Sequence, residues 1–526
     1  YWDTEIKNAQ KDGLQDFPVF TRKSSTDVSY HACANKLLAY RDTIYPQFAT
    51  HNAHTVAAIL NMANDKETFE FQRLHGMGET LHDIVLRENG TRCRIYAPVG
   101  AHRDLLAYLV RRLLENGANS SFVNQIVDKA VAPETVAADP FETYQTTSRA
   151  IATGPELFLP TRRNAVGFDL AHAPTLTQID LARTKFAAQT WQAAPILAAA
   201  IDTAPMADVV NPARPDDVVG HVQNSTANDV AAALGAAQPW DAPTSVRQEV
   251  LGRAADLAEE NYGEIFALLA REAGKGLPDC VAELREGVDF MRYYATQATG
   301  APAAGIFTCI APWNFPFAIF CGQICAALAA GNGVLAKPAA QTPLIAHLAV
   351  RLLHKAGVPQ SALQLLPGGG DVGALLTSDP RVGGVAFTGS TATAMRIRTA
   401  MAQNCAPGTP LIAETGGLNA MIVDSTALPE QAVQAIIESA FQSAGQRCSA
   451  LRCLYVQEDI AEGFTKMLIG AMQALRMGNP WDLSSDVGPV IDAAAHKTIT
   501  DHISQARESG RVLAELDAPK DGTFIA

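Results

Sequence analysis

The sequence lacks the patterns of a secreted, zinc-binding or nucleic-acid-binding protein. Its 9 cysteines include no CxxC pair, and an odd number scattered through 526 residues indicates reduced cytosolic thiols rather than a disulfide framework. We therefore expect a cytoplasmic protein with no metal site. The net charge of −13 argues against affinity for nucleic acid or for anionic membranes. The opening residues, YWDTEIKNAQ, contain no initiator methionine and no secretory leader, so we expect an internal piece of a longer protein.

Charged side chains are absent from residues 293–336, which raises the question of a membrane helix. Polar and helix-breaking residues divide this run into short segments: Pro312, Asn314, Pro316, Gln323 and Asn332. Buried strands and helices of an α/β core explain such a run better than a membrane span does.

The first hundred residues alternate apolar runs with helical stretches. The runs YPQFATHN, FEFQRLHGMG and RCRIYAPVG read as strands, with polar residues where the strands end (Thr50, His51, His75 and Tyr96). The stretch DLLAYLVRRLLENGA then predicts an amphipathic helix that Gly117 ends. This alternation is typical of a parallel sheet or a β/α barrel, in which polar residues at strand ends do the chemistry.

Residues 128–185 form a looser pattern that we interpret as a connector between residues 1–127 and residues 186–526. After residue 304, strands and helices alternate clearly. One predicted helix, TPLIAHLAVRLLHKAG, has Thr342 as its expected N-cap. This alternation predicts a doubly wound sheet of the nucleotide-binding kind over about residues 300–412, followed by the start of a catalytic domain over about residues 413–526.

Five short motifs follow one another in this second part of the chain. They are APWNFP (311–316), LAKP (335–338), FTGS (387–390), ETGG (414–417) and GQRCSA (445–450). Each is weak alone, because a lone cysteine in a turn is usually core and an exposed glutamate is usually only solvated. Together and in this order they resemble the aldehyde dehydrogenase superfamily over roughly residues 185–526.

That resemblance implies cysteine-dependent oxidation of an aldehyde. Cys448 would be the nucleophile, and the side-chain amide of Asn314 with the Cys448 backbone N–H would hold the oxyanion. Glu414 would be the general base that activates water against the thioester. Cys453, five residues further on, is expected to lie in a strand and to pack.

The resemblance also implies NAD as the cofactor. The pyrophosphate would lie at the helix that opens after FTGS, and Lys337 would reach the adenosine ribose. Ala340 stands where relatives usually carry a ribose-binding glutamate, a departure that weakens NAD binding or relaxes the rejection of NADP. GGGDVG (368–373) satisfies the GxGxxG pattern, but a small-residue turn is its plainer interpretation. The residues so assigned are Trp313, Lys337, Gly389, Ser390 and Gly416 for NAD, and Arg447 and Ser449 for the aldehyde.

The first part of the chain resembles the proline dehydrogenase barrel through the segments YWDTEIK, TRKSST, FATHNAHT, FQRLHGMGE and YLVRRLLENGANSSF. Adjacent arginines on a helix are usually solvated. The resemblance instead implies that Arg111 and Arg112 clamp the carboxylate of proline, with Tyr96 and Tyr108 around the ring and Glu115 fixing the site. It implies FAD contacts from Trp2, Thr21, Lys23, Thr50, His51, Glu115 and Phe122.

The tandem of the two parts resembles the proline utilization A family. The implied function is bifunctional: FAD-dependent oxidation of L-proline, then NAD-dependent oxidation of L-glutamate γ-semialdehyde to L-glutamate. The family also implies quinone as electron acceptor, peripheral association with the inner face of the bacterial membrane, and a homo-oligomer. About half of the eight barrel strands and the end of the aldehyde dehydrogenase domain are expected to lie outside this sequence. Two alternatives stay open: a generic NAD(P)-dependent aldehyde dehydrogenase, and an inactive truncated binding or regulatory module.

Overall fold

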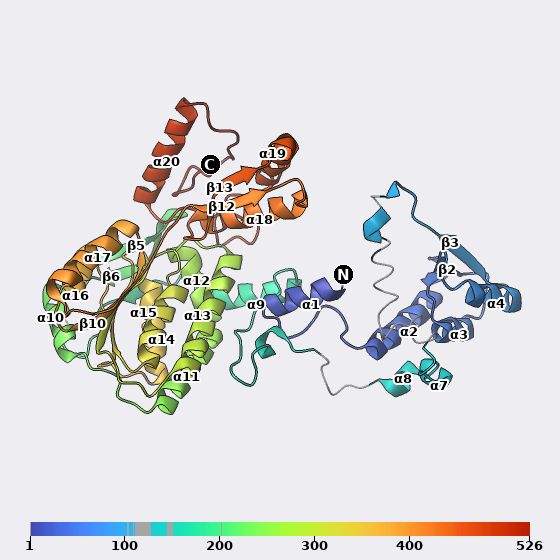
Figure 1. Ribbon diagram of the computed structural model, residues 1–526, viewed down its shortest axis with the longest axis horizontal. Helices are drawn as coiled ribbons and strands as arrows, with labels where there is room; N and C mark the ends of the chain where they lie inside the picture. The colour runs from blue at the N-terminus through green and yellow to red at the C-terminus, as the bar shows by residue number, and fades with distance from the viewer. Residues whose placement is uncertain are drawn as a thin grey trace. The chain divides into compact units, whose positions relative to one another are not determined.

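The structure is a computed structural model that describes residues 2–102, 105–108, 110, 128–144, 151–200, 202 and 204–526. It divides into two compact units (Figure 1). The first comprises Tyr1–Ala9 and Asp16–Ala152, and the second comprises Gln10–Gln15 and Thr153–Ala526. Part of the expected connector, residues 153–185, therefore groups with the second unit, while the domain boundaries themselves stay a prediction.

The first unit contains a three-stranded parallel sheet in the order β1-β2-β3. Its strands are β1 (Gln47–Ala49), β2 (Glu70–Leu74) and β3 (Arg92–Tyr96), and its helices include α2 (Lys23–Ala39), α3 (Ala53–Met62), α4 (Glu79–Asn89), α7 (Pro133–Val136) and α8 (Pro140–Thr143). Helix α1 (Trp2–Lys11) begins in this unit, and its last two residues group with the second. Phe48, Phe69 and Phe71 are buried with Ile59 of α3 in one apolar core. The predicted alternation of strand and helix is confirmed for these three strands.

The second unit is built on a five-stranded parallel sheet in the order β11-β10-β7-β8-β9. Its strands are β7 (Ile306–Ile310), β8 (Gly333–Lys337), β9 (Leu363–Leu365), β10 (Val382–Gly389) and β11 (Leu411–Thr415). The chain runs outward from β7 to β9 and then returns to add β10 and β11 on the other side of β7. The doubly wound topology predicted from the sequence is therefore confirmed, with its switch point between β7 and β10.

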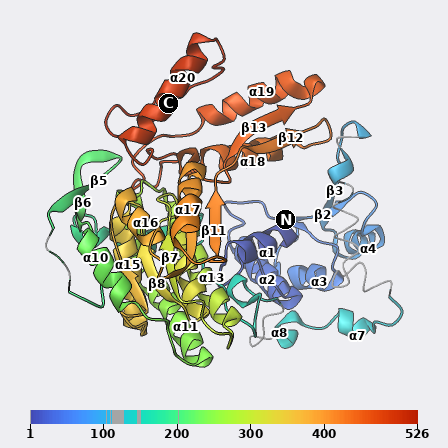
Figure 2. The same cartoon turned by 60° about the vertical axis from the view of Figure 1, so that its left-hand side comes forward.

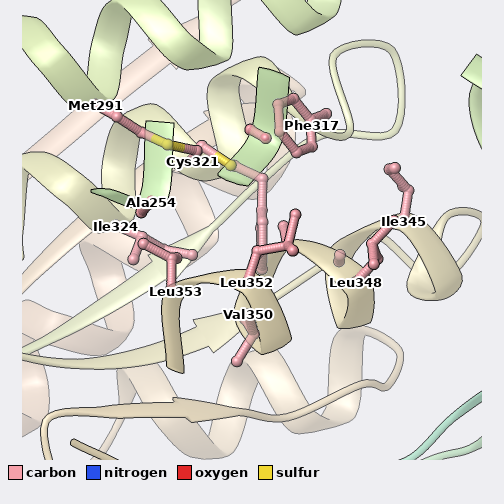
Figure 3. Packing of buried hydrophobic residues seen from close by; sticks show 14 of the residues in the cluster. Ala254, Met291, Phe317, Cys321, Ile324, Ile345, Leu348, Val350, Leu352 and Leu353 are labelled. Atoms are coloured by element: carbon pink, nitrogen blue, oxygen red, sulfur yellow. The ribbon is translucent and has the colours of Figure 1, made fainter. Parts of the chain in front are cut away.

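Helices cover both faces of this sheet because successive strand residues point to opposite sides. In β7, Cys309 packs into one apolar cluster, whereas Ile306 and Ile310 pack into another. The first cluster includes residues of α11 (Thr244–Glu260), α13 (Leu277–Gln297), α14 (Ala318–Ala329) and α15 (Pro343–Ala356); the second includes residues of α10 (Ala227–Ala236), α16 (Gly370–Thr377) and α17 (Thr391–Asn404). Figure 3 shows Met291 of α13 and Cys321 of α14 pointing toward one another in the first cluster.

The charge-free run of residues 293–336 belongs to this core. It supplies the end of α13, then β7, α14 and most of β8. No helix in the described part of the chain is long and apolar enough to cross a membrane. The interpretation of this run as short buried elements is confirmed.

Two smaller sheets complete the second unit. One has the order β4-β6-β5, and the other pairs β12 with β13 in parallel (Figure 2). The elements are η1 (Gly154–Glu156), α9 (Ala173–Thr184), β4 (Trp191–Ala193), β5 (Met206–Asn211), β6 (Arg214–Gln223), α12 (Tyr262–Glu272), β12 (Asn419–Val423), α18 (Pro429–Phe441), η2 (Gln442–Gly445), β13 (Leu451–Val456), α19 (Glu458–Gln473) and α20 (Ala493–Glu508). The apolar run NAMIV thus forms β12, outside the central sheet.

The side chain that caps the start of helix α15 is not the one expected from the sequence. Thr342 occupies the N-cap position, but its side chain makes no capping hydrogen bond. The buried carboxyl group of Glu272 instead accepts hydrogen bonds from the backbone N–H groups of Leu344 at 2.7 Å and Ile345 at 2.9 Å. Burial raises the pKa of Glu272 to about 8, and these two N–H groups oppose the rise.

Candidate functional site

The predicted site residues of the second unit follow three strands that lie side by side at the switch point. Trp313 and Asn314 come after β7, Gly389 ends β10, Ser390 caps α17 and Gly416 comes after β11. Because the carboxyl ends of parallel strands share one edge, these residues gather there. Open α/β sheets bind ligands at this place.

A cavity of about 910 Å³ lies at this edge. Among its lining residues are seven that were predicted from the sequence: Trp313, Asn314, Gly389, Ser390, Gly416, Arg447 and Cys448. Lys337, Glu414 and Ser449 do not line it. The structure thus brings together the predicted nucleophile, the predicted oxyanion donor and the predicted pyrophosphate-binding helix end.

The turn before Cys448 has an unusual backbone. Ser443 and Ala444 adopt left-handed conformations with φ of 57° and 53°, and Gly445 follows with φ of 69°. Only glycine adopts this region readily, so two non-glycine residues in succession are strained. Strained backbone of this kind persists where surrounding contacts enforce it, often at functional sites.

Contacts from several elements hold this turn. The Asn314 side chain donates one N–H to the backbone oxygen of Gln446 at 2.9 Å. The Gln446 side chain donates to the Ser443 oxygen at 3.0 Å and accepts from Ile491 N–H at 2.9 Å. A side-chain amide carries two N–H groups, so the bond to Gln446 uses one of them and the predicted role of Asn314 as oxyanion donor would need only the other.

Exposure separates Cys448 from the cysteines of the core. Cys448 is exposed, whereas Cys280, Cys309, Cys321 and Cys325 are buried. Burial raises the pKa of the Cys309 thiol to about 12 and raises the pKa of the other three buried thiols as well. A thiol must ionise to act as a nucleophile, so these buried groups are inert at neutral pH. Cys453 lies in β13, as expected.

Glu414 and Ser449 lie next to the cavity in sequence but not among its lining residues. Glu414 is an exposed residue of β11, where it pairs with Thr388 of β10. Ser449 is exposed directly after Cys448. The roles of general base and aldehyde contact that the sequence assigns to them stay predictions.

Lys337 ends β8 and points to the side of α16. Its Nζ donates hydrogen bonds to the backbone oxygens of Pro338 at 2.7 Å and Gly368 at 2.8 Å. Burial lowers the pKa of Lys337 to about 8, and the nearby Asp371 carboxylate opposes the shift. The GGGDVG turn therefore has an observed partner in Lys337, and the predicted contact of Lys337 with the adenosine ribose stays a prediction. Ala340, in the turn after β8, is exposed.

Arg447 is held within the protein. Its guanidinium forms an ion pair with the buried Asp279 and donates to Gln442 Oε1 at 3.0 Å. Sequence reasoning missed Asp279, Lys275 and Glu283, which contact Arg447, Ser443 and the start of α14, respectively. The signal in KGLPDCVAELRE is the spacing of Asp279 and Glu283, which stand four positions apart and therefore share one helix face.

Three of the residues predicted for the first unit lie at the carboxyl edge of its sheet, and a fourth lies in a helical segment. Thr50 and His51 directly follow β1, and Tyr96 ends β3, so they share the carboxyl edge of the parallel sheet. His51 Nε2 accepts from the Leu74 N–H at 3.3 Å. A Cβ at Gly78 would lie 2.9 Å from His51 Cδ2, so the glycine makes room for the ring. Tyr108 is half-buried in a helical segment.

Three further residues predicted for flavin lie near the start of the chain. Trp2 is exposed and donates from Nε1 to the Phe20 oxygen at 2.7 Å, and Lys23 is ion-paired with Asp27. Thr21 precedes α2 and is half-buried. Arg111, Arg112, Glu115 and Phe122 lie outside the described residues.

The residues at the switch point fit a dinucleotide. The first turn of α17 opens onto the cavity at Gly389 and Ser390, and a helix N-terminus favours phosphate. A Cβ at Gly416 would meet no atom within 4 Å, so space is open on the β11 side. The sheet order, this helix end, and an exposed cysteine that lines the same cavity as an amide donor are the features of a nucleotide-binding enzyme with a cysteine nucleophile.

Comparison with known proteins agrees with this class. The family model described as the aldehyde dehydrogenase family matches residues 200–526, and the one described as proline dehydrogenase matches residues 1–125. The chain belongs to the aldehyde dehydrogenase family.

Three relatives illustrate the likeness. The bifunctional protein PutA of Escherichia coli (strain K12) is 50% identical over 568 residues, covering 100% of this chain and 43% of that protein. A mutant of Bradyrhizobium japonicum proline utilization A (PutA) aligns with a TM-score of 0.85 at 45% identity, covering 100% of this chain and 53% of that one. The 1-pyrroline-5-carboxylate dehydrogenase from Thermus with bound NAD aligns with a TM-score of 0.64 at 30% identity, covering 69% and 76%. The chain thus spans about half the length, or less, of the PutA proteins it matches.

Proposed function

We propose that the natural protein containing this chain oxidises L-proline to L-glutamate in two steps. FAD-dependent dehydrogenation gives pyrroline-5-carboxylate, which hydrolyses to L-glutamate γ-semialdehyde, and an NAD-dependent step oxidises that aldehyde. The observation that carries the second step is the cavity at the switch point, where Cys448, Asn314 and Ser390 meet. The match of residues 1–125 to proline dehydrogenase favours this substrate over a generic aldehyde and over an inactive binding module.

The chemistry of the aldehyde site follows from its residues. The Cys448 thiolate adds to the aldehyde carbon, and the oxyanion accepts hydrogen bonds from the free Asn314 N–H and the Cys448 backbone N–H. NAD, when bound, supplies the hydride acceptor for this oxidation. The oxidised adduct is a thioester on Cys448, which water hydrolyses to the carboxylic acid and the free thiol. Glu414 takes the proton of that water, with a rotation of its exposed side chain toward the cavity.

Cofactor and substrate positions complete the proposal. Gly389, Ser390, Trp313 and Gly416 would hold NAD at α17, with Lys337 on the adenosine side. FAD would lie at the carboxyl edge of the first sheet, against Thr50 and His51. Arg111 and Arg112 would bind the proline carboxylate. We place the domain boundaries at residues 127 and 185.

The wider setting is also a proposal. Relatives named as bifunctional PutA proteins support a cytoplasmic enzyme with both activities in one polypeptide. We propose a quinone as acceptor of the flavin electrons, which calls for peripheral contact with the membrane, and a homo-oligomeric assembly. Two sites in one chain would allow direct transfer of the intermediate, so NADH would form from proline without a lag.

The test of the aldehyde step uses the natural full-length protein and the variants Cys448→Ser and Cys453→Ser. Cys448→Ser should lower NADH formation from L-glutamate γ-semialdehyde by about a thousandfold or more, because serine is a far weaker nucleophile. Proline-dependent dye reduction should persist in both variants, and Cys453→Ser should keep NADH formation. Undiminished NADH formation in Cys448→Ser would refute the assignment.

A further inference from the structure

Next to the turn before Cys448 lies a buried pair of opposite charges that the proposed chemistry does not use. Lys275 and Glu283 expose 2% and 1% of their side chains, and Lys275 Nζ lies 3.3 Å from Glu283 Oε1. Burial raises the pKa of Glu283, and the Lys275 ammonium opposes this rise. Burying such a pair generally stabilises a fold no better than apolar residues of similar size. Stability alone therefore does not account for its presence.

Glu283 contacts the loop that carries the oxyanion donor. Its Oε2 accepts hydrogen bonds from the backbone N–H groups of Phe317 at 3.2 Å and Ala318 at 2.8 Å. These groups begin α14, three and four residues after Asn314. The carboxylate on α13 therefore fixes where the Asn314 loop ends and the helix begins.

Lys275 contacts the loop that carries the nucleophile. Its Nζ lies 3.4 Å from Ser443 Oγ, at the first left-handed residue of the turn before Cys448. The same ammonium lies 5.0 Å from the centre of the Phe315 ring, directly after Asn314. One cation thus touches both loops.

A second ion pair, besides that of Lys275 and Glu283, connects α13 to the Cys448 turn. Asp279 stands one helical turn before Glu283 on α13 and is ion-paired with Arg447, the neighbour of Cys448. The Arg447 guanidinium lies 5.7 Å from the centre of the same Phe315 ring. Two carboxylates on one helix face therefore engage two cations, and both cations reach Phe315.

We propose that Lys275 and Glu283 are positioning residues that set the Cys448 turn against the Asn314 loop. The pair holds Ser443 in its left-handed conformation and fixes the start of α14. The Cys448 thiolate and the Asn314 amide therefore keep their positions relative to one another. This inference rests on the proposed role of Cys448 as nucleophile. It goes beyond that role by assigning the geometry of the site to a charge pair that touches no reacting atom.

The test compares matched carboxyl groups in the natural full-length protein. Glu272, like Glu283, is buried and accepts from two backbone N–H groups at the start of a helix, but the helix is α15, which neither of the two loops leads into. Lys275→Met and Glu283→Gln should each lower kcat for aldehyde oxidation by about tenfold or more, with KM changing less than about threefold. Glu272→Gln should lower Tm comparably and leave kcat within about twofold.

The double variant Lys275→Met/Glu283→Gln separates positioning from stability. Removing both charges should restore Tm toward that of the natural protein, because no unpaired charge remains buried. The double variant should not restore kcat, because neither the Cys448 turn nor the start of α14 regains its contact with a charged group. If kcat recovers together with Tm, or falls with Tm in Glu272→Gln as well, the pair only stabilises the fold and the proposal is wrong.

A second measurement does not depend on the aldehyde substrate. Iodoacetamide alkylation of Cys448, followed by peptide mass spectrometry, should slow by about threefold or more in Lys275→Met as the turn relaxes. The exposed Cys33 of the first unit serves as internal reference and should react at an unchanged rate. Unchanged alkylation of Cys448 would overturn the positioning role. If Cys448 alkylation slows in Lys275→Met as expected but the natural protein oxidises no aldehyde, the proposed function is refuted instead.

Discussion

At the scale of single residues, the most informative feature is the left-handed backbone at Ser443 and Ala444. The sequence QSAG suggests a turn, but only Gly445 in it is a residue that tolerates positive φ freely. A left-handed conformation costs a non-glycine residue roughly 1–2 kcal/mol. The structure supplies compensating contacts from residues far away in sequence, such as Lys275 and Asn314.

Ala444→Gly should stabilise the protein. Glycine adopts φ of 53° without a Cβ penalty, so we expect a gain of about 0.5–1 kcal/mol in the free energy of unfolding after the entropy of the unfolded glycine is subtracted. The control is Ala402→Gly in the exposed last turn of α17, which should lose about 0.5–1 kcal/mol. Urea denaturation measures both. Equal losses in the two variants would contradict the strain at Ala444.

Lys337 makes the free energy of unfolding depend on pH in the alkaline range. Its folded pKa of about 8 lies below the ordinary 10.5, so the unfolded chain binds more protons between these values. The penalty for burying the ammonium is fully present below pH 8 and is relieved as pH rises toward 10.5. We expect the free energy of unfolding to rise between pH 7.5 and 9.5 by on the order of 1–2 kcal/mol relative to Lys337→Met. Parallel pH profiles for the two proteins would contradict the lowered pKa.

Those cavity residues of the second unit that belong to short sequence motifs could be predicted. Cys448, Asn314 and Ser390 stand in short motifs whose order along the chain is distinctive, and the cavity brings them together. The spacing of Asp279 and Glu283 puts both on one helix face, but the burial of Lys275 and Glu283 could not be predicted, because charged residues are usually solvated. Their burial depends on contacts with residues that are distant in sequence. Ser443, for example, lies 168 residues after Lys275.

At the scale of elements, the strands of the central sheet were predictable because they are buried on both faces. Short apolar runs bounded by glycine and proline mark β7, β8 and β10, and the helices between them have clear periodicity. The cap of α15 was not predictable, because it comes from α12. Thr342 has the right local chemistry, but Glu272 is better placed in three dimensions.

Loss of the Glu272 cap should cost more than loss of a local cap. Glu272→Ala leaves the N–H groups of Leu344 and Ile345 buried without acceptors, so we expect a loss of about 2–4 kcal/mol. Thr226→Ala removes the local capping box of α10 and should cost about 1 kcal/mol. Thermal unfolding of the two variants gives the comparison. A smaller loss for Glu272→Ala than for Thr226→Ala would contradict tertiary capping of α15.

At the scale of the whole molecule, the two units are not consecutive in sequence. Residues Gln10–Gln15 group with the second unit, although residues on both sides of them group with the first. Within the second unit, the Gly167 N–H donates to the Gly13 oxygen at 2.8 Å, and Arg285 of α13 donates to the Lys11 oxygen at 2.9 Å. A short segment of the part that resembles proline dehydrogenase therefore packs within the second unit, a feature that composition could not predict.

Gly167 tests this junction directly. A Cβ at Gly167 would lie 1.7 Å from the Asp12 oxygen, so Gly167→Ala must displace the Gln10–Gln15 segment and break the hydrogen bond to Gly13. We expect the second unit to lose about 2–4 kcal/mol of stability, seen as a lower Tm for loss of NAD-dependent activity. Gly470→Ala is the control, because a Cβ there meets no atom within 4 Å on the exposed face of α19. That variant should gain about 0.5–1 kcal/mol, and an unchanged Tm for Gly167→Ala would show that the second unit folds without residues 10–15.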